Sequence, residues 1–494
     1  MYVGDVRQFM RILEEVGRTH HVTREVQDGP EIAAVVWEAN ERFAADGPCL
    51  VFDRVRGFDL PVIKNLYGSY RHLALSLGLS NWEQASFKDM RDYVAPRLES
   101  KKLWQPPTLV SEGPCQEVVL TGAEATFDRF PILKWHHWDG GPYITFGATV
   151  NKDPEWGYNL GVYRTMKKSP TTATIMTGQM QDIGIYAARA LKRGQKVMDT
   201  AIVIGAPPSV AVASAMKMPS VKESEYEFAA ALSGEPVPLV RCKTVDLEVP
   251  AYAEIVFEGK LHLTETQFEG PFGEVPGTTE QGVESPTFHL SAVTHRRNPL
   301  YVSTTAGHMH SESVIVSSMR VANAYNTLKR TVVGFREAAF PVEGRGFIAV
   351  VSITKRYPGW GRQAILATLS AGFAMANVTT VIVVDEDVDV FDWAQVTSAM
   401  AWHVDPELNV MIIPAMAGGA ILTAARRKIR DWKADGPVDY SICSRIGIDA
   451  TRRMPHEGVE TVTLMKPSMP DPELIKKVAA NWASYGFPAD AKRA

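Results

Sequence analysis

The spacing of apolar residues predicts a helix at the start of the chain. Apolar side chains recur at helical intervals over residues 6–16, after Asp5, which can cap a helix, and before Gly17, which can end one. Residues 101–115 are rich in proline and polar side chains and predict a linker. Further expected elements are strands at 22–26 and 49–52 and a helix at 31–43. We therefore expect an N-terminal α/β domain over residues 1–115.

After this linker the pattern changes to short β-branched runs separated by Gly, Pro and Asn. Many short strands at this spacing are typical of a barrel or sandwich, which we expect over residues 116–305. Helical inserts interrupt it at residues 183–191 and 223–232. The expected strands lie at residues 117–120, 144–150, 157–164, 172–176, 199–204, 239–243, 253–258, 287–294 and 300–305.

From residue 306 strands and helices alternate, which predicts an α/β sheet. A linker helix at 313–334, within a linker over 306–334, leads to an α/β domain over 335–467. A polar tail over 468–494 holds one more helix, at 471–485. Within the α/β domain we expect strands at 346–353 and 380–384 and helices at 364–375 and 393–403.

Composition excludes several classes of protein. The chain has 494 residues, 45% of them hydrophobic, with 52 basic and 56 acidic side chains and a net charge of −4. A largely disordered chain and a single compact domain are therefore excluded. Nucleic acid is not expected as the main partner, because no basic excess exists to neutralise phosphates. Scattered cysteines, with neither an apolar leader nor a membrane-spanning apolar run, predict a cytoplasmic protein without membrane attachment.

The segment from Glu265 to Glu274, ETQFEGPFGE, is the most informative one. Glu269 and Glu274 lie five residues apart across a Gly-Pro-Phe-Gly turn, which can aim both at one cavity. Carboxylates gathered in this way raise one another's pKa, which suits proton transfer near neutral pH. The alternative is a polar turn on the surface, although two phenylalanines among the acids are unusual there.

A second candidate segment is YNLGVYR, residues 158–164. Alternate residues of a strand share a face, so Arg164 would lie with Leu160 and Val162. An arginine on an apolar face needs an anionic partner or ligand, and its guanidinium suits a carboxylate or a phosphate. The alternative is a structural ion pair at the edge of the core.

Other polar groups have simple structural explanations. Acids around Glu225 favour a helix N-terminus, and Asp182 is most simply the N-cap of the helix that follows it. The paired histidines at 136–137 and at 308 and 310 could bind a metal, but each pair lacks a clear third ligand. Phosphate-loop, zinc-helix and GxSxG motifs are absent from the sequence.

Taken together, these segments resemble the UbiD family of decarboxylases, which use prenylated FMN. The resemblance covers nearly the whole chain. It implies a mixed α/β fold with an N-terminal α/β domain, a central split β-barrel of flavin-reductase type and a C-terminal α/β domain that builds homodimers, sometimes hexamers. It is carried, in chain order, by DVRQFMRILEEVGRTHHVTREV, WHHWDGGPYIT, YNLGVYR, SEYEFAAALSGEP, EGPFGE, KRYPGWGRQ and VIVVDEDVDVFDW.

The resemblance implies catalytic roles for three residues. Arg164 would hold the substrate carboxylate or the polar edge of the cofactor. Glu274 would donate the proton that replaces CO₂ on the substrate carbon. Glu269 would hydrogen-bond to Arg164 and tune it.

The resemblance also implies a metal and cofactor site. Asn159, Asp182 and Glu225 would bind a divalent ion, manganese or magnesium, that bridges the protein to the flavin phosphate, with a potassium ion beside it. Asn159, Glu225 and Arg164 would also contact the cofactor, and so would Gly161, Val162, Tyr163, Gln181, Ser214, Met216, Met218 and Pro219.

Two positions depart from the family pattern. Well-known members carry a histidine where this chain has Asp182, which remains a suitable ligand for a hard metal but adds negative charge beside a phosphate. Residues 378–380 lie where many relatives carry a lysine that reaches the cofactor, and this chain has Val-Thr-Thr.

The implied reaction is reversible, non-oxidative decarboxylation of an aromatic, heteroaromatic or α,β-unsaturated carboxylic acid. The partners would be this acid, CO₂ and a flavin prenyltransferase that supplies the cofactor. His308 and His310 would line the substrate pocket, or else belong to a surface loop. Two other functions stay open: an FMN-dependent NAD(P)H oxidoreductase with a split barrel, and a catalytically decayed family member whose metal site is lost through Asp182.

Overall fold

The structure is a computed structural model that describes residues 2–371, 377–418, 421, 424, 427–433, 436–455, 457 and 470–488. The chain divides into two compact units, Met1–Thr451 and Arg452–Ala494. The predicted domain boundaries, after residues 115, 305, 334 and 467, stay predictions. No described helix combines the length and the apolar character that a membrane crossing demands.

The N-terminal segment folds around a sheet of order β1-β2-β3-β18. Asp5 caps α1, since its carboxylate accepts a hydrogen bond from the backbone N–H of Gln8 (2.7 Å), and Gly17 follows with φ of +69°, both as predicted. The elements are β1 (Thr19–Val22), β2 (Cys49–Phe52), β3 (Val62–Lys64), β18 (Tyr301–Val302), α1 (Val6–Glu15), α2 (Gly29–Phe43), α3 (Tyr70–Ser76) and α4 (Phe87–Glu99).

Two strand predictions in this region were wrong. The strand expected at 22–26 is β1, which ends at Val22, because the stretch before it is the one in parallel register with β2. The last strand expected in the barrel, at 300–305, is β18, which pairs with β3 in the N-terminal sheet. The expected linker at 101–115 also contains β4 (Thr108–Leu109), paired with β12 (Pro238–Arg241) and through it with β13 (Glu248–Pro250).

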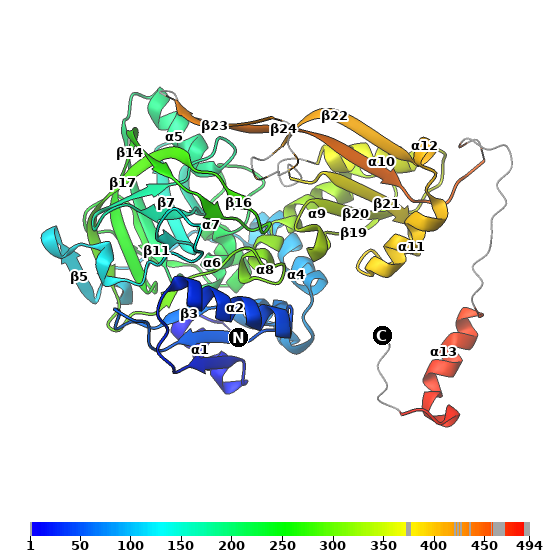
Figure 1. Cartoon of the computed structure of the whole chain (residues 1–494), viewed down its shortest axis with the longest axis horizontal. Helices are drawn as coiled ribbons and strands as arrows, with labels where there is room; N and C mark the ends of the chain where they lie inside the picture. Colours follow the sequence, from blue (N-terminus) through cyan, green and yellow to red (C-terminus); the bar gives the residue numbers. More distant parts are fainter. Residues whose placement is uncertain are drawn as a thin grey trace. The chain divides into compact units, whose positions relative to one another are not determined.

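In the described chain, the central sheet has nine strands and curls into an open half-barrel (Figure 1). Its order is β6-β9-β10-β17-β14-β11-β7-β8, with β5 on β17, which confirms the predicted barrel. The helices α5 (Asp182–Lys192), α6 (Pro208–Ser214) and α7 (Glu225–Ser233) pack on β8. The strands are β5 (Val118–Thr121), β6 (Tyr143–Ile144), β7 (Gly147–Asp153), β8 (Gly157–Val162), β9 (Thr165–Lys167), β10 (Thr172–Ile175), β11 (Val197–Ile204), β14 (Ile255–Glu269) and β17 (Val283–His295).

The C-terminal sheet has the order β19-β20-β21-β24-β22, with β23 on β24. The predicted helix at 313–334 is two helices, because the backbone hydrogen bonds change to three-residue spacing around Met319 and Arg320. The helix predicted at 364–375 begins earlier and ends at Leu369; residues 372–375 lie outside the described residues. The elements are α8 (Glu312–Ser318), α9 (Val321–Thr331), β19 (Phe335–Ala339), β20 (Ile348–Ile353), α10 (Trp360–Leu369), β21 (Thr380–Asp385), α11 (Trp393–His403), α12 (Pro406–Asn409), β22 (Val410–Gly418), β23 (Arg427–Lys433) and β24 (Gly436–Asp449).

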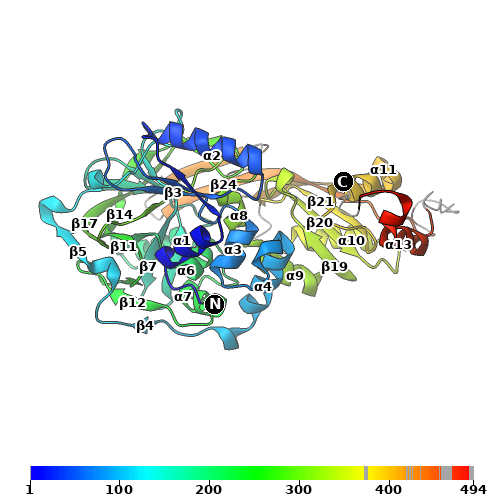
Figure 2. The same cartoon turned by 90° about the horizontal axis from the view of Figure 1, so that it is seen from below.

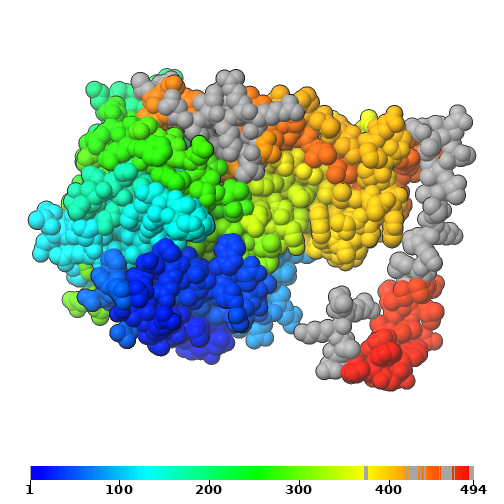
Figure 3. All heavy atoms as spheres, in the orientation of Figure 1, coloured from blue at the N-terminus to red at the C-terminus, as the bar shows by residue number. Residues whose placement is uncertain are grey.

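The hairpin of β23 and β24 connects the C-terminal sheet with the half-barrel. Figure 1 and Figure 2 show β24 leaving the sheet toward β17. At the far end the indole Nε1 of Trp432 donates a hydrogen bond to the carbonyl oxygen of Leu263 in β14 (2.9 Å). In Figure 3 the N-terminal residues (blue) lie directly against those of the half-barrel (cyan and green). The second unit contains α13 (Pro472–Ala480) and a 3₁₀ turn, Trp482–Tyr485, within the predicted helical tail.

Asp153, at the end of β7, fixes α5 on the half-barrel. Its carboxylate is 2% exposed and accepts hydrogen bonds from Arg189 Nε (3.1 Å) and Arg193 Nη1 (2.7 Å), and from the backbone N–H groups of Glu155 (2.9 Å) and Trp156 (3.1 Å). Burial raises the pKa of a carboxyl group, but these hydrogen bonds outweigh it and hold the pKa of Asp153 well below its usual range.

Asp153→Asn should therefore destabilise the chain in a pH-dependent way. At pH 7 we expect a loss of about 2 kcal/mol, because charge-assisted hydrogen bonds to α5 are weakened. A depressed pKa stabilises the fold above the usual value near 4 and loses that effect as the pH falls below it, so the deficit should shrink in acid. Urea unfolding at pH 7 and pH 3 measures the loss of stability and its decrease in acid. Asp59→Asn, on an exposed aspartate, is the control, and a deficit that does not depend on pH would contradict the assignment.

Candidate active site

Arg164 lies between two carboxylates. It follows β8, its side chain is 7% exposed, and Nη2 donates to Glu269 Oε2 (2.8 Å) while Nη1 is bonded to Glu274 Oε1. Glu269 is fully buried at the end of β14, and Glu274 is 18% exposed beyond the turn. Burial would lower the pKa of the guanidinium, but the two carboxylates raise it. The arginine predicted to need an anionic partner thus has two, one on each side of the GPFG turn.

A separate loop holds the turn that carries the two acids. The backbone N–H of Gly140 donates to the carbonyl oxygen of Pro271 (2.7 Å). Asp139, 2% exposed, accepts a hydrogen bond from the backbone N–H of Gly273 (3.2 Å) and one from that of His136 (2.8 Å). The WHHWDGG segment therefore fixes the position of the EGPFGE segment, and a β-carbon at Gly140 would lie 1.9 Å from the carbonyl oxygen of Gly270.

Tyr143 completes the environment of Glu269. Its hydroxyl donates to Glu269 Oε1 (2.8 Å), and its ring lies 4.4 Å from that of Phe272 between centroids. Burial and the carboxylate raise the pKa of Tyr143, so it remains a hydrogen-bond donor. Both oxygens of Glu269 are therefore bonded, one to Arg164 and one to Tyr143. The Nε of Arg164 is equally buried and has no hydrogen-bond partner among the described residues.

A second polar cluster lies where the metal site was predicted. Asn159 in β8 and Glu225 at the start of α7 are both nearly inaccessible. Glu225 Oε2 accepts a hydrogen bond from the backbone N–H of Leu160 (3.1 Å), and burial raises the pKa of Glu225 to about 8. The hydroxyl of Tyr163 donates to Asn159 Oδ1 (3.3 Å) and accepts from the backbone N–H of Ile183 (3.2 Å), which brings the start of α5 to this cluster.

Asp182 is not the N-cap of α5, contrary to the simplest interpretation of its sequence position. Gln181 occupies the cap position and makes no side-chain cap bond, whereas Asp182 is the first helical residue. The carboxylate of Asp182 forms an ion pair with the ammonium group of Lys217 instead. Lys217, which follows α6 within the segment SAMKMP, was not among the predicted site residues.

These residues fit a divalent metal. Asn159, Asp182 and Glu225 offer oxygen donors, which suit Mn²⁺ or Mg²⁺. The side-chain nitrogen of Asn159 is buried without a hydrogen-bond partner among the described residues, so within that part of the chain the bond from Tyr163 to its oxygen is the contact that orients the amide. A buried carboxyl group with a raised pKa gains from a cation beside it, as Glu225 would.

The remaining predicted cofactor residues lie around the same strand and helices. Val162 and Ser214 line one hollow whose other walls are mostly apolar and include Phe146. The Ser214 hydroxyl is bonded within its own helix, to the carbonyl oxygen of Ala211 (2.8 Å). Gly161 lies buried in β8, and Gln181 Oε1 accepts a hydrogen bond from the backbone N–H of Gly178 (2.7 Å). Met216 and Met218 are buried and Pro219 is exposed.

The loop with His308 and His310 packs on the N-terminal segment. His308 Nε2 lies 3.1 Å from Glu41 Oε1, and its ring contacts that of Trp37 in α2 (4.8 Å between centroids). Nδ1 of His310 is buried without a partner among the described residues. Arg345 Nη1 donates to the carbonyl oxygens of residues 276 (3.0 Å) and 307 (2.7 Å), which joins this loop to the segment after Glu274. A role for the two histidines in the substrate pocket stays a prediction.

Tyr143, Asp139 and Lys217 are site residues that no sequence pattern indicated. The first two lie in the segment WHHWDGGPYIT, but their partners are more than a hundred residues away in the sequence. Lys217 meets Asp182 only because α5 and the end of α6 pack beside the same strand.

Three family models match the chain. They describe the N-terminal domain (residues 10–87), the Rift-related domain (108–309) and the C-terminal domain (313–450) of 3-octaprenyl-4-hydroxybenzoate carboxy-lyase, UbiD. Two uncharacterized proteins match over most of their length. One from Synechocystis sp. is 31% identical over 98% of this chain and 96% of its own, and one from Archaeoglobus fulgidus is 32% identical over 98% of both.

Solved structures of similar fold are decarboxylases and related enzymes. Vanillic acid decarboxylase of Sedimentibacter hydroxybenzoicus, in closed form, gives a TM-score of 0.85 at 27% identity, covering 98% of this chain and 99% of that one. The UbiD-class enzyme HmfF of Pelotomaculum thermopropionicum in complex with FMN gives 0.79 at 29% identity, covering 95% and 98%. An evolved dimeric form of HmfF in complex with prenylated FMN gives 0.78 at 27% identity, covering 98% and 100%.

Gly140→Ala should destabilise the ion pairs that Arg164 forms with Glu269 and Glu274. The added carbon would collide with the backbone at Gly270, so the loop or the turn must shift, and we expect a loss of about 2 kcal/mol with a lower midpoint of thermal unfolding. The control is Gly47→Ala, whose β-carbon would meet its nearest neighbour at 3.8 Å, an ordinary contact. Equal midpoints for the two variants would show that the loop does not hold the turn.

Proposed function

The chain belongs to the UbiD family of carboxy-lyases, and from this premise we propose that it is a reversible, non-oxidative decarboxylase of aromatic, heteroaromatic or α,β-unsaturated carboxylic acids. The observation that carries the proposal is Arg164, buried between Glu269 and Glu274 with one N–H donor left without a partner among the described residues. Such a donor gains from an anionic ligand, since leaving it unpaired costs about 1–3 kcal/mol. A carboxylate is the anion that a decarboxylase must bind.

Decarboxylation breaks the bond between the carboxyl carbon and the substrate carbon and leaves the electron pair on the latter. No amino-acid side chain accepts that pair. Prenylated FMN, when bound, supplies the electron sink. The cluster of Asn159, Asp182 and Glu225 would hold the flavin at its phosphate, through a divalent ion.

The protein groups would bind the carboxylate and deliver a proton. Nη1 of Arg164 is bonded to Glu274, so an incoming carboxylate competes with Glu274 for it. Glu274, once displaced, takes up a proton, and after CO₂ leaves it gives that proton to the substrate carbon. One proton is consumed and one CO₂ released for each acid, and the reverse sequence carboxylates the product. Glu269, held by Arg164 and Tyr143, keeps the guanidinium in place.

The proposal also covers a second ion, the supply of the cofactor, the oligomeric state and the cellular compartment. It includes a potassium ion beside the divalent metal, cofactor supply by a flavin prenyltransferase, and a homodimer or hexamer built through residues 335–467. The four cysteines are unpaired thiols, which suits the cytoplasm. Membership of a carboxy-lyase family does not favour the alternative function of an FMN-dependent NAD(P)H oxidoreductase. The other alternative, a decayed metal site, is tested together with Asp182→Asn.

Glu274→Gln should abolish turnover without loss of the fold. An amide cannot donate this proton, so we expect CO₂ release and solvent deuterium incorporation into the product to fall by at least about 100-fold. The protein is co-expressed with a flavin prenyltransferase and assayed on a panel of aromatic and α,β-unsaturated acids.

Glu284→Gln is the matched control, since Glu284 is an exposed carboxylate on the neighbouring strand β17. Its activity should equal that of the natural sequence. Full activity in Glu274→Gln would contradict the role of Glu274.

Asp182→Asn should weaken binding of the divalent ion. Loss of one charged oxygen ligand is expected to lower Mn²⁺ affinity by about tenfold or more. Electron paramagnetic resonance of free Mn²⁺ during titration measures this, and native mass spectrometry reports bound flavin. Asp246→Asn, on an exposed aspartate, is the control. If the natural sequence binds neither Mn²⁺ nor flavin, the site is decayed and the proposed function is wrong.

A further inference from the structure

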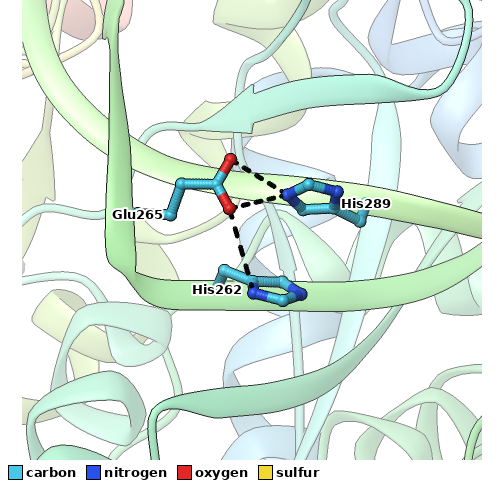
Figure 4. Close-up of side chains that lie close together, drawn as sticks. All are labelled: His262, Glu265 and His289. Atoms are coloured by element: carbon cyan, nitrogen blue, oxygen red, sulfur yellow. Dashed lines mark hydrogen bonds and ion pairs between the residues drawn. The ribbon is translucent and has the colours of Figure 1, made fainter.

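A group of two histidines and a glutamate lies on the half-barrel and takes no part in the proposed reaction. His262 and Glu265 belong to β14 and His289 to β17, and Figure 4 shows the three side chains turned toward one another. In the antiparallel register His262 lies opposite Thr287 and His289 opposite Lys260. The two histidines are therefore diagonal neighbours on one face of the sheet.

A bulge brings the carboxylate to these histidines. The ladder between β14 and β17 is interrupted after His262 and continues at Thr266, opposite Pro286, so residues 263–265 stand outside it. Glu265 therefore does not follow the alternation of side chains between the two faces of the sheet. Its side chain lies over the face that carries both imidazoles.

The bulge is held in place by its own backbone. The N–H of Leu263 donates to the carbonyl oxygen of Lys196 (2.9 Å), and the carbonyl oxygen of Leu263 accepts from Trp432 Nε1 (2.9 Å). The side chain of Leu263 is buried in the core. Glu265 therefore belongs to an ordered segment, which lowers the entropic cost of binding a ligand.

The separations approach those of a metal site. His289 Nε2 lies 3.0 and 2.9 Å from the two oxygens of Glu265, and His262 Nδ1 lies 4.0 Å from Glu265 Oε2. One ligand atom from each residue lies within 4.8 Å of the others. A tetrahedral Zn²⁺ with bonds of about 2.0–2.1 Å holds its ligands roughly 3.4 Å apart, so small side-chain rotations suffice.

We propose that His262, Glu265 and His289 bind a transition-metal ion of the Zn²⁺ class, with water in the fourth position. Two imidazole nitrogens and one carboxylate oxygen suit Zn²⁺, Co²⁺, Ni²⁺ or Cu²⁺, unlike the oxygen donors expected to bind Mn²⁺. Lys260, which shares the face, directs its ammonium group to Asp199 (3.5 Å). Among the described residues, this is the group of three histidine or acidic side chains that meets a metal-binding geometry.

The bound ion would cross-link β14 and β17 next to the segment that leads to Glu269. The site is independent of the proposed reaction, so metal binding alone tests it. The alternative is an ordinary exposed ion pair between His289 and Glu265, which would need no contribution from His262.

The test is a titration of the untagged, full-length chain after removal of metals. Mn²⁺ is added first to occupy the oxygen-donor site, and Zn²⁺ binding is then measured by calorimetry. We expect one Zn²⁺ per chain, with the dissociation constant raised at least tenfold by His262→Ala, His289→Ala or Glu265→Gln. Bound Cu²⁺ should show magnetic coupling to two imidazole nitrogens, and to one in either histidine variant.

His21→Ala is the matched control, because His21 is a half-exposed imidazole paired with a carboxylate, Asp53 (3.0 Å). Its Zn²⁺ affinity should be unchanged, and circular dichroism should show that every variant is folded. Zn²⁺ binding that is absent from the natural sequence, or as tight in His262→Ala as in the natural sequence, would overturn the proposal.

Discussion

A buried arginine must be matched by negative charge, and this requirement organises the centre of the molecule. Arg164 is buried at the junction of β8 and β9, and its partners lie more than a hundred residues later, Glu269 at the end of β14 and Glu274 beyond the turn that follows. Removing one partner of a buried ion pair costs about 3–5 kcal/mol, so the pairing also fixes how these strands meet. The WHHWDGG loop then has to hold the turn, since the acids reach the arginine only from this backbone position.

Much of the fold could be predicted from the sequence where one face of an element is buried. Helix α1 follows from its apolar spacing and its cap, and the buried parts of β11, β14 and β17 follow from their β-branched runs. The second half of β14 could not be predicted, because its side chains are largely exposed and lose the strand pattern. The break between α8 and α9 has no glycine or proline to mark it.

The candidate site was predictable in part for a similar reason. An arginine among apolar residues signals a partner, and two acids across a tight turn signal a shared target, so local patterns point to Arg164, Glu269 and Glu274. Lys217 and the histidines of β14 and β17 give no such signal. Their neighbours depend on helix packing and on the register of a bulged ladder, which only the three-dimensional arrangement determines.

The ion pair of Asp182 and Lys217 has a consequence for how the protein can have diverged. The family resemblance implies a histidine in place of Asp182, and a neutral imidazole would carry no net charge. Aspartate and lysine together also sum to zero, whereas a change of Asp182 alone or of Lys217 alone would alter the net charge of a partly buried cluster that also holds Glu225. We therefore expect the residues at positions 182 and 217 to vary together among members of the family.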